Sequence, residues 1–278
     1  MGFCEEKLES LLSLMKKYAE EDIIVAFSGG VDSSIILKAA CMAASQSGKK
    51  VYAVTMHTTL HPSADIEISK KVADELGAEH TIIYADEIEN AGIKNNPVDR
   101  CYLCKKYLFN EIKKKAEELG VRYILEGTNE DDLHVYRPGI KAVKELGIMS
   151  PLAECKITKK EVRFFAEKYG ISVSDRPSAP CLATRFPYNT PISYENMKKV
   201  EKGEEFIKTF GVYNIRLRIH NNIARIEIDE KYMMKIIEHK KEIIEYLKNL
   251  GYDYVTIDLE GFRSGSMDIF LNKAQGGK

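Results

Sequence analysis

A short turn rich in glycine and serine follows the first strongly apolar run of the chain. The run is residues 23–27 (IIVAF), and the turn, residues 28–34, reads SGGVDSS. Glycine lets a backbone turn sharply and approach a ligand closely, and the amide groups that open the next helix attract anions. The residues that would bind a phosphate group in this turn are Ser28, Gly29, Gly30, Asp32, Ser33 and Ser34.

The carboxylate of Asp32 would repel a bare phosphate, so its place in the turn favours a polyphosphate that is neutralised by Mg²⁺. The pattern is neither G-x-x-x-x-G-K-[ST] nor G-x-G-x-x-G, which excludes a Walker loop and a dinucleotide fingerprint. The alternative is an ordinary serine–glycine turn that caps a helix. The density of hydroxyl groups directly after a buried strand favours phosphate.

Three of the six cysteines stand where a thiol could do chemistry. Cys101 and Cys104 are three positions apart near the start of a predicted helix, so both thiols lie on one face. Cys181 lies in a proline-rich loop, and Arg185, four residues later, would favour its thiolate. The C-x-x-C pair suits metal binding or redox chemistry, but it also extends an apolar helical stripe and could belong to the core. The cysteines without a motif are Cys4, Cys41 and Cys155.

Arginines recur in the C-terminal third of the chain. Arg216 and Arg218 alternate along a predicted strand and so share a face, and Arg225 follows a predicted hairpin turn. Paired guanidinium groups suit the phosphate of a nucleotide substrate. The alternative is a solvated strand face on which Glu227 is an ion-pair partner. Two weaker candidates for acid–base chemistry are Glu204 and Glu205.

The elements that must position these residues alternate along the first part of the chain. Apolar runs predict strands at 23–27, 51–56, 80–85 and 121–127. Helical patterns separate them, over 5–19, from 31 onward, over 63–76 and from Pro97 to 119. This order is typical of an α/β domain in which helices cover both faces of a mostly parallel, Rossmann-like sheet.

The alternation stops near residue 174. Four of the eight prolines lie between 177 and 191, which predicts a loop and a domain junction at 174–193. We therefore expect domains at 1–175 and 176–278. The second is a smaller α+β domain for substrate binding or oligomerisation, with helices at about 193–209 and 230–249. Its predicted strands are NIRLRIH, IARIEI and YDYVTIDL, and Asn221-Asn222 makes the hairpin turn between the first two.

Composition narrows the class of protein. The 278 residues are 44% hydrophobic and 30% charged, which excludes a disordered chain. The net charge of −1 gives no global positive field for nucleic acid. No apolar run is long enough to cross a membrane, and the N-terminus lacks a cleavable signal pattern. We expect a cytoplasmic enzyme whose cysteines are thiols or ligands.

The turn at 28–34 resembles the PP-loop of the N-type ATP pyrophosphatases. That family cleaves ATP between the α- and β-phosphates and adenylylates an acceptor oxygen. The resemblance implies ATP and Mg²⁺ at the turn, adenine held by backbone groups of the strand that carries Thr55, and Gly127 beside the nucleotide. The segment GTNEDD (127–132) is either part of this site or an ordinary helix cap.

Further segments narrow the resemblance. Residues 97–105 (PVDRCYLCK), 180–188 (PCLATRFPY), the arginine-bearing strands and 261–267 (GFRSGSM) together look like the LarE sulfur transferases. The likeness runs from the PP-loop nearly to the C-terminus, and PCLATRFPY is its most specific part. That family adenylylates a carboxylate of pyridinium-3,5-biscarboxylic acid mononucleotide and replaces it with a thiocarboxylate, towards the nickel-pincer nucleotide cofactor.

Two branches of this family obtain sulfur differently. In one, a cysteine gives up its own sulfur, a role that falls on Cys181 here. In the other, three cysteines hold a [4Fe-4S] cluster, and Cys101, Cys104 and Cys181 match them. The resemblance implies that the fourth iron, which has no cysteine ligand, binds sulfide or another sulfur donor. The resemblance also implies a homo-oligomer. A redox C-x-x-C pair stays open, as does a zinc site completed by one of His57, His61, His80 and His134.

Other functions remain as alternatives. A PP-loop tRNA thiolase shares the C-x-x-C and distant-cysteine pattern, but the near-zero charge and the lack of a basic aromatic cluster count against nucleic acid. An ammonia-using synthetase would not need Cys181. A nucleotide-binding regulatory protein without catalysis is the alternative from another class, and pyrophosphate release would distinguish it.

Overall fold

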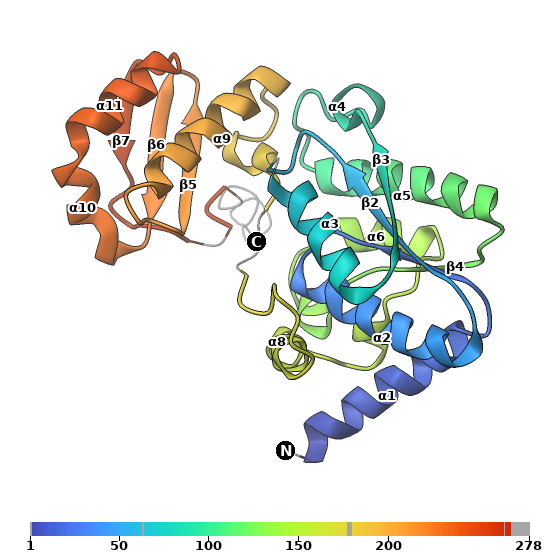
Figure 1. Cartoon of the computed structure of the whole chain (residues 1–278). Helices are drawn as coiled ribbons and strands as arrows, with labels where there is room; N and C mark the ends of the chain where they lie inside the picture. The colour runs from blue at the N-terminus through green and yellow to red at the C-terminus, as the bar shows by residue number, and fades with distance from the viewer. Residues whose placement is uncertain (1, 63, 177–179, 264, 268–278) are drawn as a thin grey trace, which may run out of the picture. The chain divides into compact units, whose positions relative to one another are not determined.

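The computed structural model describes residues 2–62, 64–176, 180–263 and 265–267 (Figure 1). The chain divides into two compact units. The N-terminal unit comprises Met1–Ile93 and Asp99–Ala179, and the C-terminal unit comprises Lys94–Val98 and Pro180–Lys278. Each unit has its own sheet.

In the described part of the N-terminal unit, a sheet of four parallel strands has the order β3-β2-β1-β4. The strands are β1 (Ile23–Ala26), β2 (Val51–His57), β3 (Glu79–Tyr84) and β4 (Tyr123–Leu125). Val25 pairs with Ala53 on one side and with Leu125 on the other. The predicted α/β class with a parallel sheet is thus confirmed, and the segments after β1 and β4 leave the sheet side by side.

Helices cover both faces of this sheet, which explains why β1 is apolar at consecutive positions. Ile23 and Val25 pack in a core with α1 (Gly2–Tyr18), α2 (Val31–Ser47) and α8 (Lys159–Lys168). Ile24 points the other way, into a core with α5 (Arg100–Leu119) and α6 (Gly139–Glu145). The other helical segments of this unit are α3 (Ala64–Leu76), α4 (Glu87–Asn90), η1 (Glu130–His134) and α7 (Pro151–Glu154).

The helix expected from Pro97 begins three residues later, at Arg100. The reason is that residues 94–98 belong to the C-terminal unit. The side chain of buried Asn96 donates hydrogen bonds to the carbonyls of Phe186 (3.1 Å) and Pro187 (2.7 Å). The observed division after Ala179 lies in the same segment as the predicted boundary at 175, and residues 177–179 of that segment lie outside the described residues.

The C-terminal unit is built on a mixed sheet in the order β5-β6-β7. β5 (Ile215–His220) and β6 (Ile223–Ile228) are antiparallel, and β7 (Tyr254–Ile257) is parallel to β6. Asn221 has a φ of 56°, as the predicted hairpin turn requires. Helices α9 (Tyr194–Lys208) and η2 (Leu182–Arg185) precede β5.

The prediction of a single helix at 230–249 is wrong in detail. The segment forms η3 (Glu230–Tyr232), α10 (Met233–Glu238) and α11 (Lys240–Asn249). At His239 the backbone has φ −94° and ψ 16°, which departs from helical geometry and lets the chain change direction.

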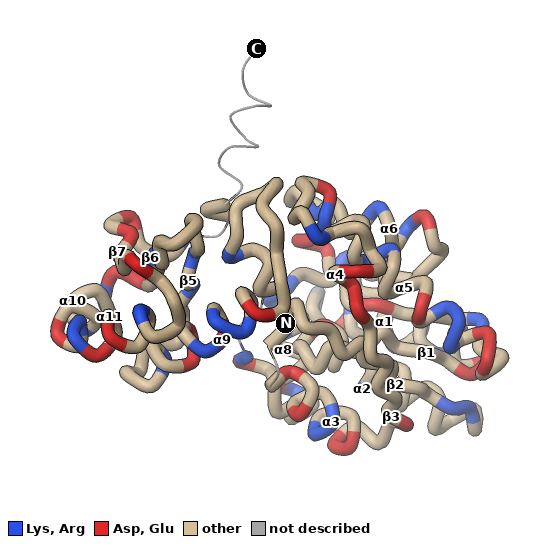
Figure 2. The backbone as a smooth tube through the Cα atoms, turned by 90° about the horizontal axis from the view of Figure 1, so that it is seen from above, with Lys and Arg blue, Asp and Glu red and all other residues tan. Residues whose placement is uncertain are grey.

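Acidic and basic residues are interspersed along both units, as the net charge of −1 implies (Figure 2). No helix among the described residues has both the length and the apolar composition that crossing a bilayer would need.

Candidate active site

A pocket of about 320 Å³ lies in the N-terminal unit, beside the residues that follow β1, β2 and β4. This is where open parallel sheets bind ligands, because the strands on either side diverge there and leave a crevice. Of the predicted nucleotide-binding residues, those that line it are Ser28, Asp32, Ser33, Thr55 and Gly127. The described residues Gly29, Gly30 and Ser34 do not line it; they shape the turn from behind.

The Ser–Gly turn is held by its own hydroxyl groups. Ser33 and Ser34 donate to the carbonyl of Gly30 at 3.0 and 2.8 Å, and the hydroxyls of Ser28 and Ser33 are 3.2 Å apart. Ser34 is fully buried, so its hydroxyl is a structural brace. Ser28 is exposed at the pocket, directly ahead of the first turn of α2.

Two glycines let main-chain segments approach one another closely around the turn. Gly29 has a φ of 69°, and a Cβ there would lie 3.0 Å from the Cα of Ser69 on α3. A Cβ on Gly127 would lie 3.1 Å from both the Cβ of Asp32 and the amide nitrogen of Ser33. The segment after β4 therefore packs so closely on the start of α2 that a side chain at position 127 would have to displace it.

Both carboxylate oxygens of Asp32 have partners. Asn129 donates from its Nδ2 to Oδ1 at 3.1 Å, and the ammonium group of Lys159 forms an ion pair with Oδ2. Asn129 follows β4, and Lys159 is the first residue of α8. Lys159 was not predicted from the sequence, because Lys159 is 127 positions from Asp32 and follows no recognisable motif.

The segment GTNEDD (127–132) both caps a helix and lines the pocket, so the two alternatives for its sequence do not exclude each other. Asn129 and Asp132 form a capping box at η1, in which each side chain accepts a hydrogen bond from the other's backbone amide. Gly127, Thr128 and Asp132 also line the pocket. Capping fixes the segment, and the fixed segment forms one wall of the site.

Next to β2 the pocket has a group of apolar residues, which we call its apolar side: Val54, Met56, Pro62 and Ile66. Polar residues from the same segments also line the pocket: His57, Thr58, His61 and Asp65. The hydroxyl of Thr55 donates to the Phe27 carbonyl at 2.7 Å and lies 2.8 Å from Nε2 of His80. Because the only hydroxyl proton of Thr55 is used, His80 is the donor in the second bond. Burial lowers the pKa of His80, which keeps the imidazole neutral.

The opposite side, next to β4, is charged. Buried Glu126 accepts from the Thr128 amide (2.9 Å), the Ser150 hydroxyl (2.6 Å) and the ammonium group of Lys105 (3.2 Å). Burial alone would raise the pKa of Glu126, but Lys105 and these donors outweigh it and hold the pKa below its usual range. Arg137 pairs with Asp132 at 3.0 Å. Lys105 and Arg137 both line the pocket, and neither was predicted as a site residue, although Lys105 ends the quoted segment 97–105.

The cysteines of the C-x-x-C pair lie at the start of α5. Cys101 is exposed and Cys104 is half-buried, whereas the buried apolar residues of that helix begin further along, at Phe109. Cys101 is therefore not a core residue, and the Arg100 guanidinium lies 3.7 Å from its sulfur. Within the residues that the structure describes, no group of three or more His, Cys, Asp or Glu side chains is placed to hold a metal ion.

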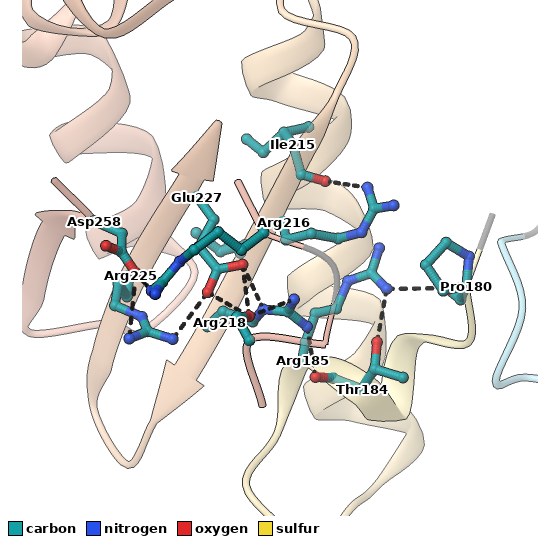
Figure 3. Close-up of polar contacts among 12 residues, drawn as sticks. Pro180, Thr184, Arg185, Ile215, Arg216, Arg218, Arg225, Glu227 and Asp258 are labelled. Carbon is teal, nitrogen blue, oxygen red and sulfur yellow. Dashed lines mark hydrogen bonds and ion pairs between the residues drawn. The ribbon is translucent and has the colours of Figure 1, made fainter. Parts of the chain in front are cut away.

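In the C-terminal unit, half-buried Cys181 stands directly before η2, and Arg185 fixes the surrounding loop (Figure 3). The guanidinium of Arg185 donates to the carbonyls of Pro180 (2.9 Å) and Cys181 (3.3 Å). It also pairs with buried Glu204 at 2.8 Å. Glu204 accepts a further bond from the amide of Leu217, so this carboxylate holds the loop against β5.

Arg218 and Arg225 share a carboxylate that has no exposed surface, Glu227 (Figure 3). Their nitrogens lie 2.9 Å from its two oxygens. The other two nitrogens of Arg218 donate to the Thr184 carbonyl (2.7 Å) and the Ser266 hydroxyl (2.9 Å). Glu227 is therefore an ion-pair partner, as the alternative for these strands expected, but the pair is buried and the expected solvated face is wrong. Arg218 is fully engaged within the protein.

Arg216 differs from its neighbours. Its guanidinium lies over the ring of Phe262, 5.1 Å from the centroid, and donates to the carbonyl of Ile215. Among the described residues it forms no ion pair with a carboxylate. Burial, with the charges of nearby Arg185 and Arg218, lowers the pKa of Arg216 to about 10. An anion that binds beside this buried guanidinium would stabilise its charged form.

Comparisons with known proteins identify relatives of the whole chain. Residues 15–97 match the asparagine synthase family. The pyridinium-3,5-bisthiocarboxylic acid mononucleotide synthase of Lactiplantibacillus plantarum is 34% identical, over 99% of this chain and 98% of its own length. An uncharacterized protein of Synechocystis is 36% identical over 97% of this chain and 99% of its length. A tRNA-specific 2-thiouridylase of Rickettsia bellii is more distant, at 25% identity over 80% of this chain and 69% of its length.

Proposed function

The chain belongs to the LarE family, the pyridinium-3,5-bisthiocarboxylic acid mononucleotide synthases, and from this premise we propose that it is an ATP-dependent sulfur transferase. The proposed substrate is a pyridinium mononucleotide with a carboxylate that becomes a thiocarboxylate. The observation that carries the proposal is the pocket, in which one Ser–Gly turn stands between an apolar side and a charged side. A nucleotide and an acidic acceptor need that combination.

ATP occupies the apolar side and the turn in this proposal. The adenine ring packs beside Val54 and Ile66, and the phosphates reach Ser28, Ser33 and the amides that open α2. Asp32 fits Mg²⁺, since carboxylate and hydroxyl oxygens are its preferred protein ligands. When bound, the ion would neutralise the pyrophosphate that leaves.

The acceptor carboxylate occupies the charged side. A carboxylate that approaches the α-phosphate of ATP meets repulsion between like charges. Lys105, held by Glu126, and Arg137, held by Asp132, place two cations on the pocket wall where they offset this repulsion. Their partners are themselves hydrogen-bonded, so the cations are positioned before the substrate arrives.

The chemistry then needs two displacements. A carboxylate oxygen attacks the α-phosphorus, and the bond from that phosphorus to the oxygen bridging it to the β-phosphate breaks, which releases pyrophosphate. A sulfur nucleophile next attacks the acyl carbon, and AMP leaves with the oxygen that it received. If the thiolate of Cys181 is the nucleophile, loss of its Cα proton and cleavage of its Cβ–Sγ bond leave dehydroalanine and the thiocarboxylate.

The second source of sulfur in this proposal is sulfide or another donor, delivered with Cys101, Cys104 and Cys181 as ligands of a [4Fe-4S] cluster. Two thiols one helical turn apart at the exposed start of α5 suit such a cluster, as does the guanidinium beside Cys101. When bound, the cluster would offer an iron without a protein ligand to a small sulfur species. The homo-oligomer implied by the family stays a prediction.

Arg216 is the proposed contact for the substrate phosphate. It is the arginine of its group that has no carboxylate partner among the described residues, whereas Arg218 and Arg225 already neutralise Glu227. We assign Arg218 and Arg225 the role of positioning the strands that carry Arg216.

Replacing Asp32 by Asn should abolish pyrophosphate release without unfolding the protein. The variant keeps the shape of the side chain but loses the charge that Mg²⁺ requires, so the rate should fall by about 100-fold or more. The measurement is pyrophosphate release with ATP, Mg²⁺ and acceptor. Asp74→Asn, on an exposed position of α3, is the control. Wild-type release by the Asp32→Asn protein would overturn the assignment and favour a regulatory role.

Arg216→Met and Arg218→Met should differ in kind. Arg216→Met should raise the KM for the mononucleotide, because it removes one charge-assisted hydrogen bond worth about 1.5–3 kcal/mol. The free energy of unfolding of this variant should be nearly unchanged. Arg218→Met removes one of the two buried partners of Glu227 and should lower the free energy of unfolding by about 3–5 kcal/mol. Substrate titrations and urea denaturation measure the two effects. Equal KM values for wild type and Arg216→Met would remove the phosphate assignment.

Anaerobically purified protein should contain about four iron and four sulfide per chain after reconstitution. Cys101→Ser or Cys104→Ser should lose the iron and multiple turnover. Cys4→Ser, a substitution on α1 outside the motifs, should keep both. If Cys181 is sacrificial, one turnover survives in the Cys101 and Cys104 variants and is lost in Cys181→Ser. A wild-type protein that turns over repeatedly without iron would contradict the cluster.

A further inference from the structure

The ion pair between Lys159 and Asp32 occupies the carboxylate that the proposed function assigns to Mg²⁺. Oδ1 of Asp32 accepts from Asn129 and Oδ2 contacts the ammonium group of Lys159, so each oxygen already has one partner. A metal ion that binds Oδ2 would be repelled by the ammonium group in contact with the same oxygen, so we expect the ammonium group to move away when the metal ion binds. Lys159 therefore either hinders the binding of a metal ion at Asp32 or takes part in it.

The location of Lys159 is unfavourable for a cation unless an anion is close. Thr158 is the N-cap of α8, so Lys159 is the first residue of that helix, at the positive end of its dipole. Asp32 lies in the first turn of α2, where the backbone amides also carry positive partial charge. The carboxylates of Asp131 and Glu161 accept hydrogen bonds from the backbone amides that open α8. Among the described residues, the ammonium group of Lys159 has Asp32 as its ion-pair partner.

The main chain at Lys159 is fixed while its side chain is not. The capping box of Thr158 and Glu161 and the bond from the Lys159 amide to Asp131 (2.8 Å) hold the backbone. The side chains of Lys159 and Asp32 are 33% and 23% exposed, so water reaches the pair. A flexible four-carbon stem on a rigid base can turn its ammonium group without moving the helix.

We propose that Lys159 is an exchangeable counter-ion of the PP-loop, an inference that rests on the ATP site proposed above. Without nucleotide, its ammonium group neutralises Asp32. When Mg·ATP binds, the metal ion takes over Asp32, and the ammonium group turns to the β- and γ-phosphates, where it offsets the charge of the departing pyrophosphate. No bond is made or broken in this exchange.

The exchange predicts opposite effects on two ligands. Lys159→Met frees Asp32, so Mn²⁺ alone should bind about 3-fold to 10-fold more tightly, as measured by electron paramagnetic resonance without nucleotide. The same variant lacks the cation for the phosphates, so Mg·α,β-methylene-ATP should bind about 10-fold to 100-fold more weakly by calorimetry. Lys159→Arg should stay close to wild type for both ligands.

Lys160→Met, the exposed neighbour on α8, is the matched control and should change neither affinity. Circular dichroism checks folding, and Lys159→Gln replaces the Met variant if that one does not fold. Unchanged affinities in Lys159→Met, or weaker binding of both ligands, would overturn the exchange. These readouts need no acceptor and no turnover, so a failure of the sulfur-transfer proposal leaves the result interpretable.

Discussion

The close packing of the segment after β4 on the start of α2 is the constraint on which the site depends. A Cβ on Gly127 would lie 3.1 Å from the Cβ of Asp32 and from the Ser33 amide nitrogen, so any larger residue would push the two segments apart. This approach is possible because β1 and β4 are adjacent and parallel, so their carboxyl ends leave the sheet together. The wall that carries Glu126, Thr128 and Asn129 is thereby set against the phosphate-binding turn.

The C-terminal unit depends on a different interaction, the burial of charge in pairs. Glu227 and Glu204 each neutralise guanidinium groups in a setting from which water is largely excluded. Removing one partner there is costly, because the remaining charge stays buried. The network therefore fixes the loop at Cys181 and the strands around Arg216, and Arg216 is left without a carboxylate partner among the described residues.

Local patterns were sufficient to predict the elements that position the site. The apolar runs at 23–27 and 51–56 predicted β1 and β2, and the helical patterns between the apolar runs predicted the helices that cover the sheet. The turn at 28–34 was recognisable because its residues are contiguous. Lys159, Lys105 and Arg137 were not, since each comes from a helix or loop far from that turn in the sequence. The role of Arg218 was also beyond local reasoning, because an arginine on a strand looks the same whether a carboxylate or a phosphate neutralises it.

The central claim is that the acceptor carboxylate attacks ATP and that sulfur then displaces AMP. Labelling the carboxylate oxygens of the pyridinium mononucleotide with ¹⁸O tests this directly, with mass spectrometry of the products of one turnover. We expect AMP that carries one ¹⁸O atom and a product whose thiocarboxylate group retains one. Unlabelled AMP would contradict it, because the oxygen of the leaving group would then not have come from the acceptor.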